Sequence, residues 1–208
     1  MTTTDRTHDG YVVPSAGELI AARAELSELV RFKAVETEER VGFGFVGCPD
    51  APSQYQQLRG AYADSWATKT PLPISNEFCD TSIYLSPKDN MCFRFWHDVH
   101  HVKLGLSFNL DDELELATWH CTELERAGFD PAGLSFRLFR ADIVGQLYLM
   151  GIAGRFPYNQ LRFAETCLMH GFDVGLLDEL RFIPDPAASL TDSANRDDGP
   201  PTALSVVR

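Results

Sequence analysis

The segment from His97 to Glu113 gathers side chains that bind metal ions. His97, Asp98 and His101 lie in one short stretch, and Glu113 follows His101 after eleven intervening residues. Two imidazole and two carboxylate ligands suit zinc, iron or manganese, whereas the lack of cysteine in the set speaks against a closed structural zinc cage. We therefore predict a divalent-metal site, with zinc as the first choice, that keeps a coordination position open for water or substrate.

Local signals predict the helix that would carry the two histidines. Ser86 is a suitable helix cap, Pro87 fits the first helical position, and Asp89 places negative charge in the first turn. A helix that begins there reaches His97 after about three turns. His97 and His101 are then i,i+4 neighbours, so their side chains can point at one ion.

A second helix is predicted to bring Glu113 to the same ion. Asp98 lies three residues before His101 and can share the face of the first helix. The helix breaks near residues 105–109, where Asn109 can cap a second helix with an acidic first turn. If the second helix folds back antiparallel to the first, Glu113 faces the histidine pair across a short loop.

Length and periodicity predict an all-α fold, a single-domain helical bundle over residues 14–183. A chain of 208 residues is long enough for one sizeable core. Residues 1–13 are predicted to be an irregular, flexible N-terminus. Residues 184–208 are rich in Pro, Asp, Ser and Gly, and are predicted to be a flexible acidic C-terminal tail.

Other helices are predicted from capping boxes, apolar periodicity and Gly or Pro breaks. A capping box formed by Ser15 and Glu18 opens the first one, and Gly128 closes the helix that contains Glu113. The glycine-rich stretch 41–47 is predicted to be a turn or a tight backbone contact. The remaining helical segments are predicted at 52–68, from Pro131 to about Leu149, at 157–169 and at 174–182.

Charge and hydropathy restrict the partners. A formal net charge of −12 argues against a nucleic-acid binder, because binding to phosphates needs a basic surface. No stretch is long and apolar enough for an integral membrane segment, and the N-terminus lacks the order of a signal peptide. We therefore expect a cytoplasmic protein. A protein partner or a second copy of this chain is compatible with this composition.

Beyond these local signals, the motif resembles a known family signature. The pattern His97-Asp98-x-x-His101, eleven residues, then Glu113 is similar to the signature of the coenzyme Q biosynthesis protein 4 family, and Gly105-Leu106 resembles that family's inter-helix turn. The resemblance covers roughly residues 95–123. It implies a largely helical fold, those four residues as ligands of a metal usually assigned as zinc, and work in ubiquinone biosynthesis on quinone precursors or as an organiser of other enzymes.

This chain departs from the family pattern at two positions. The family usually has Gly before the motif glutamate, where this chain has Asp112, and favours another Glu seven residues on, where this chain has His120. His120 lies two helical turns beyond Glu113 and therefore on the same face. We predict His120 as an additional ligand or as a catalytic acid or base.

Three functions fit these observations. The first is a metal-dependent enzyme, a lyase or an oxidoreductase, acting on a hydrophobic aromatic or quinone-like molecule, since aromatic residues surround the motif in sequence. The second is an HD-type metal phosphohydrolase, which needs a further upstream His, here only His8, and a downstream Asp such as Asp142. The third is a non-catalytic helical adaptor with a structural metal, for which an acidic surface would suit a basic protein partner.

Overall fold

The structure is a computed structural model of the chain, and it describes residues 7–8 and 11–183. Within these residues it is a mainly helical protein, which confirms the predicted all-α fold. The seven helices of this part of the chain are α1 Ala16–Val41, α2 Tyr55–Thr68, α3 Pro87–Leu104, α4 Leu110–Arg126, α5 Leu134–Ala153, α6 Gln160–His170 and α7 Phe172–Arg181. The predicted C-terminal tail and most of the predicted N-terminal segment lie outside the described residues.

Two short strand pairs accompany the helices. β1 (Thr7–His8) pairs antiparallel with β2 (Tyr11–Val12), and β3 (Phe45–Cys48) pairs in parallel with β4 (Leu72–Ser75). The parallel pair was not predicted. Its second strand follows α2, so β3 and β4 are joined by a helical crossover, as parallel strands require.

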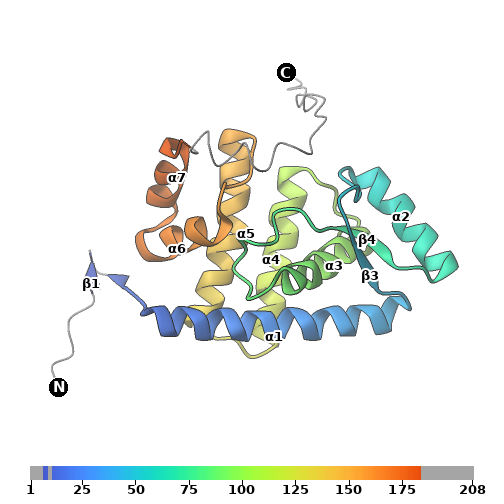
Figure 1. Cartoon of the computed structure of the whole chain (residues 1–208), viewed down its shortest axis with the longest axis horizontal. Helices are drawn as coiled ribbons and strands as arrows, with labels where there is room; N and C mark the ends of the chain where they lie inside the picture. The colour runs from blue at the N-terminus through green and yellow to red at the C-terminus, as the bar shows by residue number, and fades with distance from the viewer. Residues whose placement is uncertain (1–6, 9–10, 184–208) are drawn as a thin grey trace.

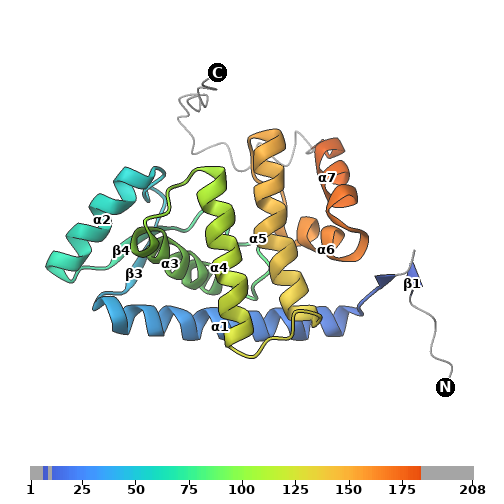
Figure 2. The ribbon, with the colours of Figure 1, turned by 180° about the vertical axis from the view of Figure 1, so that it is seen from behind.

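The long helix α1 runs along one side of the molecule, and α4 and α5 stand across it side by side (Figures 1 and 2). α1 also packs on α3, while α6 and α7 pack on the outer side of α5, away from α2. The core between these helices includes Leu26, Phe95, Trp96 and Phe139, each at most 1% exposed. This core fixes α3 and α4, the two helices that carry the motif.

The predicted ends of α1 and α3 are confirmed in atomic detail. Ser15 and Glu18 form both bonds of the capping box at the start of α1. At α3, the Ser86 hydroxyl accepts the backbone N–H of Asp89 at 3.2 Å, and Pro87 occupies the first turn. Local sequence therefore determines where the histidine-bearing helix begins, as its capping residues predict.

The turn between α3 and α4 sets how Glu113 meets α3. Gly105 ends α3 with a φ of 74°, a left-handed conformation that glycine adopts without strain. Asn109 occupies the cap position of α4, but its side chain makes no capping bond. The Asp112 carboxylate instead accepts hydrogen bonds from the backbone N–H of Ser107, at 2.8 Å, and from its hydroxyl. Asp112, one of the two departures from the family signature, thus stabilises this turn by hydrogen bonds.

Several predicted boundaries shift by two or three residues in the structure, and two stretches show why. α5 begins at Leu134 and not at Pro131, because the backbone N–H of Gly133 bonds to the carbonyl of Asp130 in a turn before the helix. In the stretch 41–47, the predicted turn is present at Gly42, with a φ of 77°, but the chain then enters β3. Within β3, a Cβ on Gly47 would lie 2.8 Å from the sulfur of Met91, so the backbone there lies close to that side chain.

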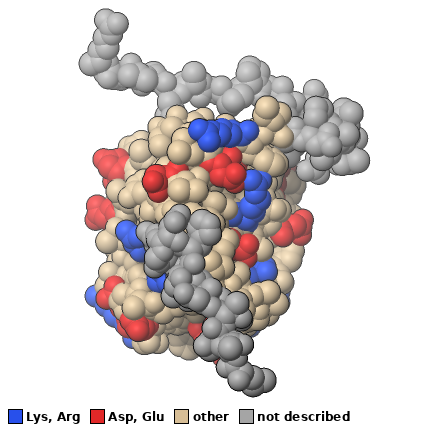
Figure 3. All heavy atoms as spheres, turned by 90° about the vertical axis from the view of Figure 1, so that its left-hand side faces the viewer, with Lys and Arg blue, Asp and Glu red and all other residues tan. Residues whose placement is uncertain are grey.

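The surface shows two further features of the described residues. None of their helices combines the length and apolar character that crossing a membrane requires. Figure 3 shows acidic and basic side chains interspersed on the side of α6 and α7, where Arg162 pairs with Asp178 at 2.5 Å. The negative net charge is therefore not gathered into one acidic patch on this side.

Gly175 allows α7 to pack closely on α6. A Cβ at this position would lie 3.2 Å from the backbone N and Cα of Cys167, and closer still to its sulfur. We expect Gly175→Ala to lower the free energy of unfolding by about 1–3 kcal/mol, as overpacking does. Gly60→Ala is the matched control: it adds a methyl group in open space on a helix and should raise stability by up to about 1 kcal/mol. Urea denaturation measures both, and equal effects of the two substitutions would contradict the close packing.

Candidate metal centre

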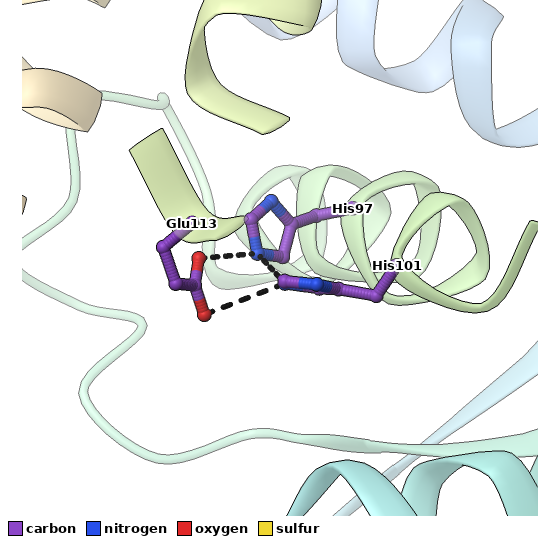
Figure 4. Close-up of side chains that lie close together, drawn as sticks. All are labelled: His97, His101 and Glu113. Carbon is purple, nitrogen blue, oxygen red and sulfur yellow. Dashed lines mark hydrogen bonds and ion pairs between the residues drawn. The ribbon is translucent and has the colours of Figure 1, made fainter. Parts of the chain in front are cut away.

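Three of the four predicted ligands come together at the junction of α3 and α4. His97, His101 and Glu113 each offer one ligand atom, and these atoms all lie within 4.8 Å of one another (Figure 4). The two Nε2 atoms of His97 and His101 are 2.8 Å apart. Glu113 places Oε2 3.5 Å from Nε2 of His97 and Oε1 3.4 Å from Nε2 of His101. This group could hold a metal ion.

The spacing of these atoms fits one common ion. Ligands at about 2.0–2.2 Å from a zinc ion, at angles between 90° and 109°, lie roughly 2.8–3.6 Å from one another. The two nitrogens, 2.8 Å apart, fall in this range, and so does each nitrogen with its own oxygen of Glu113, at 3.4 Å to Oε1 for His101 and 3.5 Å to Oε2 for His97. Two imidazole nitrogens that face each other this closely share either one hydrogen, which one ring donates and the other accepts, or a metal cation.

A backbone bond holds His101 in the orientation of a ligand. Its Nδ1 lies 3.0 Å from the carbonyl oxygen of Leu106, and because a carbonyl can only accept, Nδ1 carries the hydrogen. The lone pair of the neutral ring is then on Nε2, which faces His97 and Glu113. His101 is fully buried, so this orientation is well fixed. Such a bond on the second nitrogen is usual for metal-binding histidines.

The electrostatics of the site favour an ionised Glu113. Burial would raise the pKa of the Glu113 carboxyl, but its contacts with His101 and His97 lower that pKa to about 2. Burial would lower the pKa of His97, but Glu113 and Asp98 raise it more, so the pKa of His97 lies above its usual value. The carboxylate thus supplies negative charge to the point where the two ring nitrogens meet, as a cation site needs.

Asp98 is not part of the group of three. Its carboxyl lies near the histidines, and burial raises its pKa to about 6 against the lowering effect of His97 and His101. The helix geometry explains why it does not join them. At about 100° per residue, His101 is about 40° around the helix from His97, whereas Asp98 is about 100° from it. Glu113 meets the His97–His101 side of α3.

His120 lies behind His97 and not beside the ligand atoms. Its Nε2 is 3.2 Å from Nδ1 of His97, on the part of that ring opposite the nitrogen that faces Glu113. His120 is fully buried, and burial together with the neighbouring His97 lowers its pKa well below the usual value. The predicted face of α4 is therefore right, but the contact of His120 is with a ligand.

The phosphohydrolase hypothesis named two further groups, and the structure describes the side chain of one of them. Asp142, considered as a downstream ligand of a phosphohydrolase, is buried in α5 and does not join any group of metal-binding side chains in the described part of the chain. The side chain of His8 is not described. Of the aromatic residues near the motif, Phe108 packs against His101 with ring centroids 4.9 Å apart.

Sequence reasoning missed Tyr55, which belongs to the first turn of α2. Its ring lies 6.0 Å from that of Phe108, so α2 contributes to the aromatic surroundings of the site. No local signal pairs α2 with the turn after α3, because this contact depends on the tertiary fold.

Comparison with protein-family models, with curated proteins and with solved structures finds no match to this chain.

Proposed function

We propose that the protein binds one divalent cation through His97, His101 and Glu113 and uses it on an apolar aromatic or quinone-like small molecule. The observation that supports this most is the convergence of three ligand atoms from two helices, with the second nitrogen of each histidine already bonded. A bound cation would polarise an oxygen of the substrate or activate water. The similarity of the motif to the ubiquinone-biosynthesis family supports the class of substrate.

The ligand set favours a catalytic site over a structural one. Structural zinc sites are almost always closed by four protein ligands, whereas catalytic sites have three and leave a position open. Two histidines and one carboxylate also form the ligand set of non-haem iron enzymes, so zinc is the first metal to test and iron the second. Phe108 and Tyr55 supply apolar surface near the ligands. A cytoplasmic location stays a prediction from the sequence.

Cobalt substitution tests this proposal, because the electronic spectrum of bound Co²⁺ reports its coordination. We expect the purified protein to bind one Co²⁺ per chain and its visible bands to change when azide, and then a water-soluble benzoquinone, is added. A spectrum that neither compound alters would contradict an open catalytic site and favour the structural metal of an adaptor. Metal-dependent hydrolysis of p-nitrophenyl phosphate would instead favour a phosphohydrolase.

A further inference from the structure

His120 and His97 form a contact that the ligand set alone does not explain. Nε2 of His120 lies 3.2 Å from Nδ1 of His97, and the two rings are nearly parallel, at 14°. His97 therefore has one nitrogen directed at His101 and Glu113 and the other at His120. Only one of the two facing nitrogens, His97 Nδ1 or His120 Nε2, can carry the hydrogen of this bond.

The surroundings of His120 leave it no other polar partner among the described residues. The ring is fully buried, and its Nδ1 has no hydrogen-bond partner. Four aromatic rings enclose it at centroid distances of 4.2–6.5 Å: Phe93, Trp96, Trp119 and Phe139. A substrate held at the ligand atoms has no contact with this imidazole, because the ring of His97 stands between them. The four rings fix the orientation of His120. Its hydrogen bond to His97 is then the route by which it can affect the ligand atoms.

We infer that His120 is a positioning residue, whose Nε2 accepts the hydrogen of His97 Nδ1 and thereby directs the lone pair of His97 Nε2 at the cation. This inference rests on the proposed function. A histidine that binds metal through Nε2 must carry its hydrogen on Nδ1, and metal-binding histidines donate that hydrogen to a neighbouring acceptor. His101 donates it to the carbonyl of Leu106, and His97 donates it to the neutral ring of His120.

The hydrogen positions are directly measurable. Long-range ¹H–¹⁵N correlation spectra of the purified protein, recorded before and after addition of Zn²⁺, distinguish ring nitrogens with and without hydrogen. We expect the zinc-bound protein to carry the hydrogen of His97 on Nδ1 and the hydrogen of His120 on Nδ1, with Nε2 of His120 bare. In the zinc-bound protein, a hydrogen on Nε2 of His120 would overturn the inference, because His97 Nδ1 would then be the acceptor.

Two variants separate positioning from packing. His120→Gln can place its amide oxygen where Nε2 lies, while His120→Leu fills the site without an acceptor. Loss of such a partner typically weakens metal binding about 10- to 100-fold, which we expect for the Leu variant, and the Gln variant should stay within about threefold of the native affinity. Competition with a chelator measures Zn²⁺ affinity. Equal affinities of the two variants would overturn the inference.

The result for the native protein separates this inference from the proposed function. If the native protein binds neither Zn²⁺ nor Fe²⁺, the proposed function fails, whatever the position of the hydrogens. If it binds Zn²⁺ and His120 carries its hydrogen on Nε2, the proposed function stands and the positioning role fails.

Discussion

The double variant His97→Ala/His101→Ala is expected to lose Zn²⁺ binding while it stays folded. The substitutions remove both nitrogen ligands and leave only Glu113 of the group. Four-ligand zinc sites bind with apparent free energies of about 10–16 kcal/mol, or roughly 3 kcal/mol per ligand, so two lost ligands should weaken binding at least a thousandfold. Elemental analysis of the purified protein and chelator competition measure this loss, and circular dichroism measures the helix content.

Asp98→Asn is the matched comparison, because it changes a half-buried residue of the same helix beside His97. If three residues hold the cation, this variant should keep Zn²⁺ affinity within about tenfold of the native protein, since only the electrostatic contribution of the nearby charge changes. A loss of about a hundredfold or more, the size expected for one lost ligand at roughly 3 kcal/mol, would show that Asp98 is a fourth ligand, as the family resemblance implies. A native protein without affinity for divalent metals would contradict the proposed function.

The helices of the site were predictable because their signals are local. The cap at Ser86, the proline after it and the glycine at 105 together define α3 and place His97 and His101 one turn apart. The face of α4 that carries Glu113 and His120 follows from the helical repeat in the same way. Spacing along the chain was thus enough to find three side chains whose ligand atoms meet.

The sequence spacing did not determine which side chains of α3 and α4 meet, because this depends on how α4 crosses α3. Asp98 shares the helix of the two histidines, but the direction from which Glu113 arrives leaves it out of the group. The same crossing places His120 against Nδ1 of His97 and not at the ligand atoms. β3 and β4 were missed for a related reason: each has four residues, and each is stabilised by a partner far away in the sequence.

Asp142 is expected to make the stability of the protein fall as the pH rises from about 4 to 7. Its carboxyl is 5% exposed in α5, and its Oδ1 accepts the side-chain N–H of Gln146 at 2.7 Å. Burial raises its pKa from 3.8 to about 7, although the bond from Gln146 lowers it. The phenol of Tyr84 and the thiol of Cys167 lie near enough for Asp142 to raise their pKa values, in addition to the effect of burial, and neither supplies a compensating positive charge.

The sign follows from the protons bound in each state. Between pH 4 and 7 the folded protein keeps the proton on Asp142 and the unfolded chain has lost it, so unfolding releases a proton and becomes easier as the pH rises. The contribution of Asp142 to the free energy of unfolding is fully present below about pH 4. It is lost progressively up to pH 7 and changes little above it. The expected loss between pH 5 and pH 8 is about 2–3 kcal/mol.

Asp142→Asn should remove this dependence, because asparagine is neutral at every pH in this range and its Oδ1 can still accept from Gln146. Urea denaturation at pH 5 and pH 8 gives the change for each protein, and comparing these changes cancels any constant effect of the substitution on packing. Asp64→Asn is the control: it removes the same charge from an exposed position on α2 and should leave the dependence of the native protein unaltered. If Asp142→Asn loses as much stability between the two pH values as the native protein, the carboxyl of Asp142 is already ionised at pH 5 and its burial does not hold the proton.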